Sequence, residues 1–287
     1  MEKQKLQNVV AYVYYNRLCW HKLLNDLIRP FTINQLENTN IGHYYFEFGY
    51  SRGAHIKICL AQSMNASNLC DNLEIALNAF LKASPSKTEA ISYPLTGFFM
   101  DYPNNSYKIS IVLQTDDKCN LTESTVKSYL SKSVLSTFGM DVITQERIFR
   151  YMIYTVSALI KRHVSSITEA VSACLALTNH FRLISRKKRP QFNTQEALYK
   201  SEIDKLYKQN TLLMNEIIKD VWSGIDPELN WLENLYEIYD LVSLEKDNNP
   251  LIRICETAYR LMGIDLEDKL IICQLQLLYR AFSEQSP

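Results

Sequence analysis

One stretch, residues 43–60, constrains the fold of this chain more than any other. It reads HYYFEFGYSRGAHIKICL, and the aromatic residues at positions 44, 46, 48 and 50 alternate with the residues between them. Alternation at a period of two is typical of a strand that buries one face. The intervening Ser51–Gly53 segment ends in a glycine that can adopt the positive φ of a tight turn. The stretch therefore predicts a β-hairpin.

The second strand of this hairpin has an unusual polar face. Positions 56, 58 and 60 are aliphatic and share one face, whereas His55, Lys57 and Cys59 share the other. Two interpretations remain open. Either the sheet is half exposed and this face is simply solvated, or the polar face lines a cleft in which chemistry takes place.

The order of the remaining elements predicts an α+β protein. Val9–Tyr15 and Ser106–Gln114 have the composition of strands, and residues from 143 onward form apolar-periodic helices. We expect an N-terminal, mostly antiparallel sheet with packed helices, followed by a helical C-terminal half. The predicted limits are residues 1–142 and 143–287, packed as one compact unit.

The connection between the first two strands predicts one short helix. Leucine and isoleucine recur at helical spacing in Cys19–Ile28, and Pro30 follows directly. Because proline normally ends a helix, we expect this helix to stop before Pro30 and residues 34–42 to form a loop.

Composition limits the partners and the compartment. Lysine plus arginine and aspartate plus glutamate both total 31, and this balance argues against a dedicated nucleic-acid-binding protein. No apolar run is long enough to span a bilayer, and the N-terminus does not resemble a signal peptide. The seven cysteines are scattered without paired spacing. We therefore expect reduced thiols, a cytoplasmic location and no membrane partner.

No recognised cofactor or metal motif occurs. The five histidines lie far apart in the sequence, and no glycine-rich phosphate loop or GxSxG elbow is present. We therefore expect neither a metal nor a cofactor. A basic run at Arg186–Arg189 has three interpretations: a solvated helix C-terminus, a contact for an acidic peptide, or a contact for RNA, which is the least favoured.

Three motifs carry a resemblance to a known family. The strand His55–Cys59 is similar to the His-Leu-Arg-Leu-Arg strand of the lantibiotic dehydratase C-terminal family, also called thiopeptide-type bacteriocin biosynthesis proteins. The segment from Trp20–Leu24 to Arg29–Phe31 resembles its Trp-x-x-Leu-Leu…Arg-Pro motif, and Glu146–Phe149 resembles its Glu-x-x-Phe helix start. The order of the motifs fits a free-standing member of this family.

The resemblance implies chemistry on a ribosomally synthesised peptide, but the eliminating residues of the family are not matched. Eliminating members remove glutamate from glutamylated serine or threonine, using arginines and a histidine. Here Lys57 and Cys59 occupy the two arginine positions of the strand, no arginine lies between residues 134 and 139, and Cys255 occupies the histidine position. Lysine lacks the planar fork with which arginine grips a carboxylate.

Another branch of the family, which has also lost these residues, joins two dehydroalanines in a formal aza-[4+2] cycloaddition that forms a pyridine and expels the leader. The resemblance therefore implies a tailoring protein acting on a leader-bound, dehydroamino-acid-containing precursor, as a cofactor-free cyclase or lyase. Two alternatives stay open: a glutamate-eliminating subunit of a split dehydratase, and a non-catalytic peptide-binding partner. Whether the chain is an enzyme is left undecided.

The expected partners are the precursor peptide, with its leader and core, and a glutamylating dehydratase subunit. An edge of the N-terminal sheet is expected to capture the leader by strand addition. The candidate catalytic residues are His55, Lys57 and Tyr50, and the candidate substrate-binding residues are Tyr45, Arg52, Glu146 and Arg150.

Overall fold

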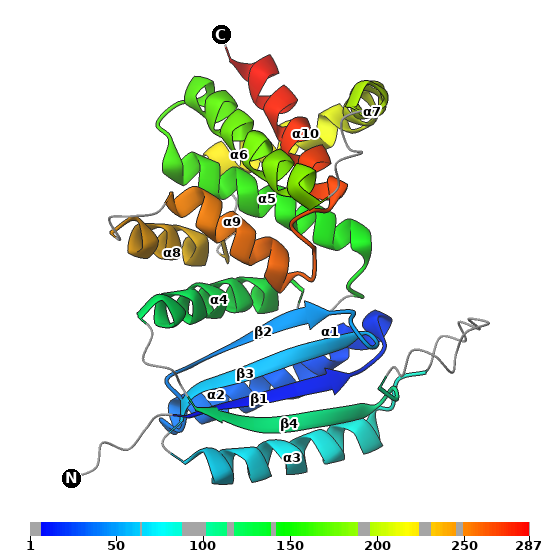
Figure 1. Cartoon of the computed structure of the whole chain (residues 1–287), viewed down its shortest axis with the longest axis vertical. Helices are drawn as coiled ribbons and strands as arrows, with labels where there is room; N and C mark the ends of the chain where they lie inside the picture. Colours follow the sequence, from blue (N-terminus) through cyan, green and yellow to red (C-terminus); the bar gives the residue numbers. More distant parts are fainter. Residues whose placement is uncertain are drawn as a thin grey trace. The chain divides into compact units, whose positions relative to one another are not determined.

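The structure is a computed structural model that describes residues 7–63, 65–87, 102–113, 118–138, 142–188, 196–223, 231–244 and 249–286. Contacts divide it into two compact units (Figure 1). Unit 1 comprises residues 1–145 and 261–263, and unit 2 comprises residues 146–260 and 264–287. The predicted division at residue 142 remains a prediction about domains.

Unit 1 is built on a four-stranded antiparallel sheet with the order β2-β3-β1-β4, as far as the described residues show. The strands are β1 (Gln7–Tyr14), β2 (His43–Gly49), β3 (His55–Ser63) and β4 (Ser106–Leu113). Together with the helical unit 2, this sheet confirms the predicted α+β class.

The hairpin forms as the sequence predicts. β2 pairs with β3 from His43↔Ala61 to Gly49↔His55. The turn places Arg52 and Gly53 at positive φ, of 57° and 106°, so the glycine takes the conformation expected of it. Burial along β2 alternates strictly, with the even-numbered residues inside.

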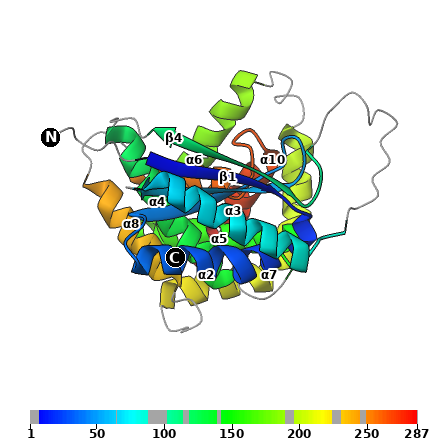
Figure 2. The same ribbon diagram turned by 90° about the horizontal axis from the view of Figure 1, so that it is seen from below.

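Helices that precede and follow the β2–β3 hairpin in the sequence cover the apolar face of the sheet. Trp20 begins α1 (Trp20–Lys22), and its ring stacks on Phe48 at 4.7 Å. The helix α3 (Ala66–Ala83) packs on β1 and β4 with its leucines buried, and lies beside the helical segment that follows α1 (Figure 2). These contacts bury the aliphatic face of the hairpin and leave the opposite face free for other contacts.

The prediction that a helix ends before Pro30 is wrong. After α1 the chain forms a π-helical segment, η2 (Leu23–Ile28), in which the Arg29 N–H bonds to the Leu24 carbonyl, and continues as α2 (Arg29–Glu37). Proline has no N–H to donate, and the change of hydrogen-bond spacing at this wider turn accommodates it. The hydroxyl of Thr32 donates to the Ile28 carbonyl at 2.7 Å. Residues 34–37 are therefore helical, and the loop is shorter than expected.

A further helix of unit 1, α4 (Lys118–Thr137), packs against β2 (Figure 1). The helices of unit 2 are α5 (Gln145–His163), α6 (Ile167–Lys188), α7 (Glu196–Ser223), α8 (Glu233–Ser243), α9 (Pro250–Leu261) and α10 (Lys269–Gln285). Within this unit α10 packs on both α6 and α7. Three residues of the basic run, 186–188, form the end of α6, and Arg189 lies outside the described residues. Among the described helices, none has the length and apolar character needed to cross a bilayer.

Candidate functional site

The second face of the sheet, here called the polar face, brings predicted and unpredicted residues into register. Cα pairing places Glu47, Lys57, Tyr12 and Lys108 in one row across β2, β3, β1 and β4. The adjacent row contains Gly49, His55, Tyr14 and Ser106. Neighbours in such a row are roughly 4.5–5.5 Å apart at their Cβ atoms, so their side chains can interact directly.

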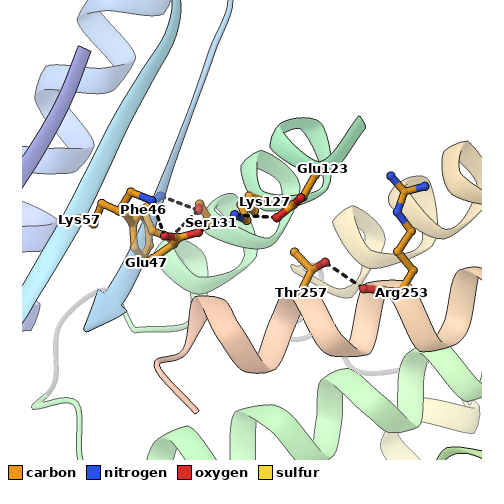
Figure 3. A network of polar contacts seen from close by, with 8 residues as sticks. All are labelled: Phe46, Glu47, Lys57, Glu123, Lys127, Ser131, Arg253 and Thr257. Carbon is orange, nitrogen blue, oxygen red and sulfur yellow. Dashed lines mark hydrogen bonds and ion pairs between the residues drawn. The ribbon is translucent and has the colours of Figure 1, made fainter. Parts of the chain in front are cut away.

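A chain of charges occupies the β2 end of this face (Figure 3). Glu47 lies between two lysines: its Oε2 is 2.9 Å from Lys57 Nζ, and its Oε1 is 2.7 Å from Lys127 Nζ. Lys127 also contacts Glu123 at 2.9 Å. The side chains of Glu47 and Lys127 are only 17% and 14% exposed, whereas Lys57 is 27% exposed. The network therefore links β3, β2 and α4 through a largely buried carboxylate.

The network fixes the charges of its members. Burial alone would raise the pKa of Glu47, but the combined attraction of Lys127 and Lys57 holds this pKa below its ordinary value. Burial likewise opposes the charge of Lys127, but Glu47 and Glu123 together raise the pKa of its ammonium group. Glu47 is therefore ionised at neutral pH and already engaged by two cations, so it is not a free base.

Aromatic rings enclose His55. His55 is 5% exposed, and the centre of its ring lies 5.7 Å from that of Tyr12 and 5.2 Å from that of Tyr14. The imidazole Nδ1 is 2.9 Å from the Gly53 carbonyl oxygen. Because a carbonyl only accepts, Nδ1 carries the proton, and in the neutral ring Nε2 has the free lone pair. The imidazole is thus held in one orientation by the hairpin that carries it.

Gly49 makes room for this imidazole. A Cβ atom added at Gly49 would lie 2.3 Å from His55 Nε2, so only glycine fits beneath the ring. The glycine is required here for space, in contrast to Gly53 in the turn, where it provides a positive φ.

Residues of α4 also contact the end of the polar face that contains His43 and Tyr45. The ammonium of Lys127 lies 5.3 Å from the centre of the Tyr45 ring, and Tyr45 also hydrogen-bonds the Cys59 side chain. Burial raises the pKa of Tyr45 and that of Cys59, so both groups stay protonated at neutral pH. His43 Nε2 is 3.0 Å from the Ser124 hydroxyl, and burial lowers the pKa of this histidine.

The structure brings some predicted site residues together and separates others. His55, Lys57 and Tyr45 share the polar face. Tyr50 does not join them: its ring packs 5.5 Å from Trp20, on the side of the buried aromatic face. The reason is the two-residue period of a strand, since Tyr50 continues the set that contains Phe48. Arg52 is exposed in the turn, where its carbonyl accepts from the Tyr102 N–H at 3.0 Å.

Two predicted substrate-binding residues belong to unit 2. Glu146 and Arg150 are exposed on the first turns of α5. Their proposed role in binding substrate stays a prediction.

Sequence reasoning missed three main contributors to the site: Lys127, Tyr12 and Glu47. Lys127 is separated from Glu47 by 80 positions, and helical periodicity gives no hint of its partner. Tyr12 lies in a strand whose continuous apolar and aromatic composition resembles that of a fully buried strand, but it is half buried and faces Lys57. Glu47 was missed although the sequence carries a signal for it: a lone carboxylate between aromatic residues indicates an ion pair, because burying an unpaired charge is costly.

Solved structures of other proteins share this fold. The pyridine synthase TbtD from thiomuracin biosynthesis matches with a TM-score of 0.66 and 15% identity, over 97% of this chain and 98% of TbtD. This chain has the TbtD fold. The sequence motifs predicted such a relationship, and the comparison confirms it at the level of the fold.

Two other structures support the same conclusion. TsrL matches with a TM-score of 0.57 and 11% identity, over 97% of this chain and 95% of TsrL. The tRNA-dependent lantibiotic dehydratase MibB from Microbispora sp. 107891 matches with a TM-score of 0.53 and 11% identity, over 99% of this chain but 28% of MibB. No protein-family model matches the sequence, and no curated protein sequence does.

The chemistry available on the polar face is that of weak acids and fixed hydrogen-bonding groups. It offers a neutral phenol at Tyr45, an oriented imidazole at His55 and the ammonium group of Lys57, which is neutralised by Glu47. No group of three or more metal-ligating side chains occurs among the described residues. Such a set can orient amides and shuttle protons, but it presents no unneutralised pair of cations and no free carboxylate base.

Proposed function

We propose that this protein is a tailoring protein for a ribosomally synthesised, post-translationally modified peptide. It acts on a leader-bound precursor that contains dehydroamino acids, as a cofactor-free cyclase of the formal [4+2], pyridine-forming type. The observation that carries the proposal is the match to the pyridine synthase TbtD over nearly the full length of both chains.

The chemistry of the polar face agrees with this proposal. A cycloaddition between two dehydroalanines requires that two distant residues of one peptide be held together, and positioning can account for much of such a rate enhancement. The accompanying shift of a proton from an amide nitrogen to its oxygen needs only weak acid–base assistance. The phenol of Tyr45, the imidazole of His55 and the ammonium of Lys57 are groups of this strength.

The same face argues against glutamate elimination, the first alternative. Elimination requires cations for the departing glutamate carboxylates and a base for the α-proton. Lys57, at the first arginine position of the family strand, already binds the carboxylate of Glu47 at 2.9 Å. The second arginine position holds Cys59, whose thiol is buried and protonated. A role as a subunit of a split dehydratase is supported only by the match to a 28% portion of MibB.

The test uses a precursor peptide chosen from the short genes that flank this one, prepared with its leader and two dehydroalanines. Incubation with the purified protein should convert it into a pyridine-containing macrocycle, a released leader amide and one molecule of water, and the two peptide products should be detected by mass spectrometry. A parallel reaction with a glutamylated precursor should show little loss of glutamate. Efficient glutamate loss would instead establish the eliminating alternative, and tight binding without any product would establish a non-catalytic partner.

Variants connect the activity to the polar face. Lys57→Met should reduce turnover at least tenfold, because it removes the ammonium group that would orient a substrate carbonyl. Lys205→Met, an exposed lysine of α7, is the matched control and should retain full activity. Equal activities for the two variants would remove Lys57 from the site.

A further inference from the structure

The sheet of unit 1 has two edges, and the structure closes one of them. In the order β2-β3-β1-β4 the edge strands are β2 and β4. On β2 the Phe46 N–H donates to the Ser131 hydroxyl at 3.0 Å, and this hydroxyl lies 3.4 Å from the Phe46 carbonyl oxygen (Figure 3). The helix α4 therefore occupies the outer edge of β2, and a peptide strand cannot be added there.

The other edge strand, β4, has few of the features that normally prevent pairing. It is eight residues long, contains no proline and carries one charge, Lys108. Its pairing with β1 runs from Gln7↔Leu113 to Tyr14↔Ser106 without a register shift, so no bulge twists it away. Within the described part of the chain no strand pairs with its outer side. Edge strands of this kind are templates for an additional strand.

The side chains of β4 are also unusually apolar for an exposed edge. Ile111, Val112 and Leu113 are 41%, 46% and 58% exposed, and together they present apolar surface on both faces of the strand. A soluble protein usually keeps such residues covered or breaks them up with charges. This surface is large enough to contribute affinity to whatever strand pairs with β4.

The surroundings of β4 specify the chemistry of that strand. On the apolar side, the Tyr107 hydroxyl donates to Glu74 of α3 at 3.1 Å. Asp71 lies one helical turn before Glu74, and both carboxylates are exposed. The polar side presents Lys108, which is exposed and forms no ion pair within the described residues. An added strand therefore meets the cation of Lys108 on one side and, on the other, the exposed side chain of Ile111 and the carboxylate of Glu74.

We propose that the outer edge of β4 captures an extended segment of the substrate peptide by strand addition. The segment places an acidic side chain beside Lys108, and apolar or basic side chains alternate with it beside Ile111 and Glu74. Backbone hydrogen bonds supply affinity, and the alternating side chains supply selectivity. This proposal rests on the proposed function in requiring a peptide substrate.

The position of this edge suits a substrate anchor. Lys108, Tyr12 and Lys57 lie in one row, so a fifth strand would run about 14 Å from Lys57, three interstrand spacings of about 4.8 Å. About four or five extended residues cover such a distance. Residues adjoining the captured segment can therefore reach the polar face while the anchor stays bound.

Hydrogen exchange tests the proposal directly. The full-length protein is mixed with the same precursor peptide, and deuterium uptake of residues 106–113 is followed by mass spectrometry. Capture by strand addition should slow exchange in this segment at least tenfold on peptide binding. Peptide binding that leaves the exchange of β4 unchanged overturns the inference, although the proposed function then still stands. A protein that binds no precursor peptide at all fails at the level of the proposed function.

Binding of a fluorescein-labelled precursor provides the second measurement. Lys108→Glu and Val112→Asp should each weaken affinity at least tenfold, because the first repels an acidic side chain and the second disrupts the apolar contact. The matched controls are Lys205→Glu, at an exposed position of α7, and Leu244→Asp, at the exposed residue that directly follows α8. Both control variants should bind the peptide normally. Equal affinities for test and control variants overturn the inference. The inference is also overturned if residues 106–113 are protected from hydrogen exchange without peptide and lose this protection on dilution. In that case a second copy of the chain occupies the edge.

Discussion

Replacing Glu47 by glutamine should destabilise unit 1 by about 2 kcal/mol at pH 7. The substitution keeps the shape of the side chain but removes the charge that Lys57 and Lys127 bind at 2.9 and 2.7 Å. Breaking a fully buried ion pair costs about 3–5 kcal/mol and an exposed pair about 0.2–1 kcal/mol. Glu47 is 17% exposed, and Lys127 keeps Glu123 as a partner, so an intermediate value is expected.

The pH dependence gives this prediction its sign. The folded-state pKa of Glu47 lies below its ordinary value, so its contribution is complete above the unfolded-state pKa, near 4.5. The contribution is lost as the pH falls through the lower folded-state pKa. The difference between wild type and Glu47→Gln should therefore stay constant from pH 8 to pH 5 and shrink only at more acidic pH.

Urea denaturation, followed by circular dichroism, measures the effect. With a slope of about 2–3 kcal/mol per M, the midpoint should fall by roughly 0.7–1 M. Hydrogen exchange of residues 43–63 assigns the loss to unit 1. Glu123→Gln is the control, because Glu123 touches the same lysine but is 43% exposed, and it should cost less than about 1 kcal/mol. Equal effects for the two variants at pH 7, or a loss of stability that is independent of pH down to pH 3, would refute the argument.

Three further predictions concern side chains that the structure encloses. If the imidazole of His55 contacts the substrate, His55→Ala should lower turnover or peptide affinity while the fold stays intact. A large loss of thermal stability, with normal activity in the folded fraction, would show that the imidazole is a structural group. Gly49→Ala should cost about 1–3 kcal/mol because its Cβ would collide with His55, and this cost should largely disappear when His55 is also alanine, as a double-mutant cycle in urea would show. The thiols of Cys174 and Cys255 are fully buried, with pKa values raised by burial, and should resist alkylation at pH 8 in native protein; rapid labelling measured by mass spectrometry would contradict their burial.

The hairpin shows how far local pattern can be followed. Alternation in residues 43–60 was sufficient to place both strands, the turn at Gly53 and the two faces, because in a strand the direction of a side chain depends only on its position in the sequence. The same rule would have separated Tyr50 from His55, since the two residues belong to opposite alternating sets. The prediction that the helix breaks at Pro30 was wrong for a different reason. A π-helical turn changed the hydrogen-bond spacing, and no local pattern in the sequence predicts such a turn.

The sequence by itself determined the strand pair, the α+β order and the family motifs, all of which depend on residues close together in the chain. Only the tertiary structure decided what covers the polar face and which sheet edge has no partner strand among the described residues. α4 brings Lys127 to Glu47 and Ser131 to Phe46, across 80 and 85 positions of sequence. Amphipathic periodicity reports that a helix has a buried face, but it carries no information about which strand that face will meet. For that reason the ion pair of Lys57 and the position of β4 at the edge of the described sheet became visible only in three dimensions.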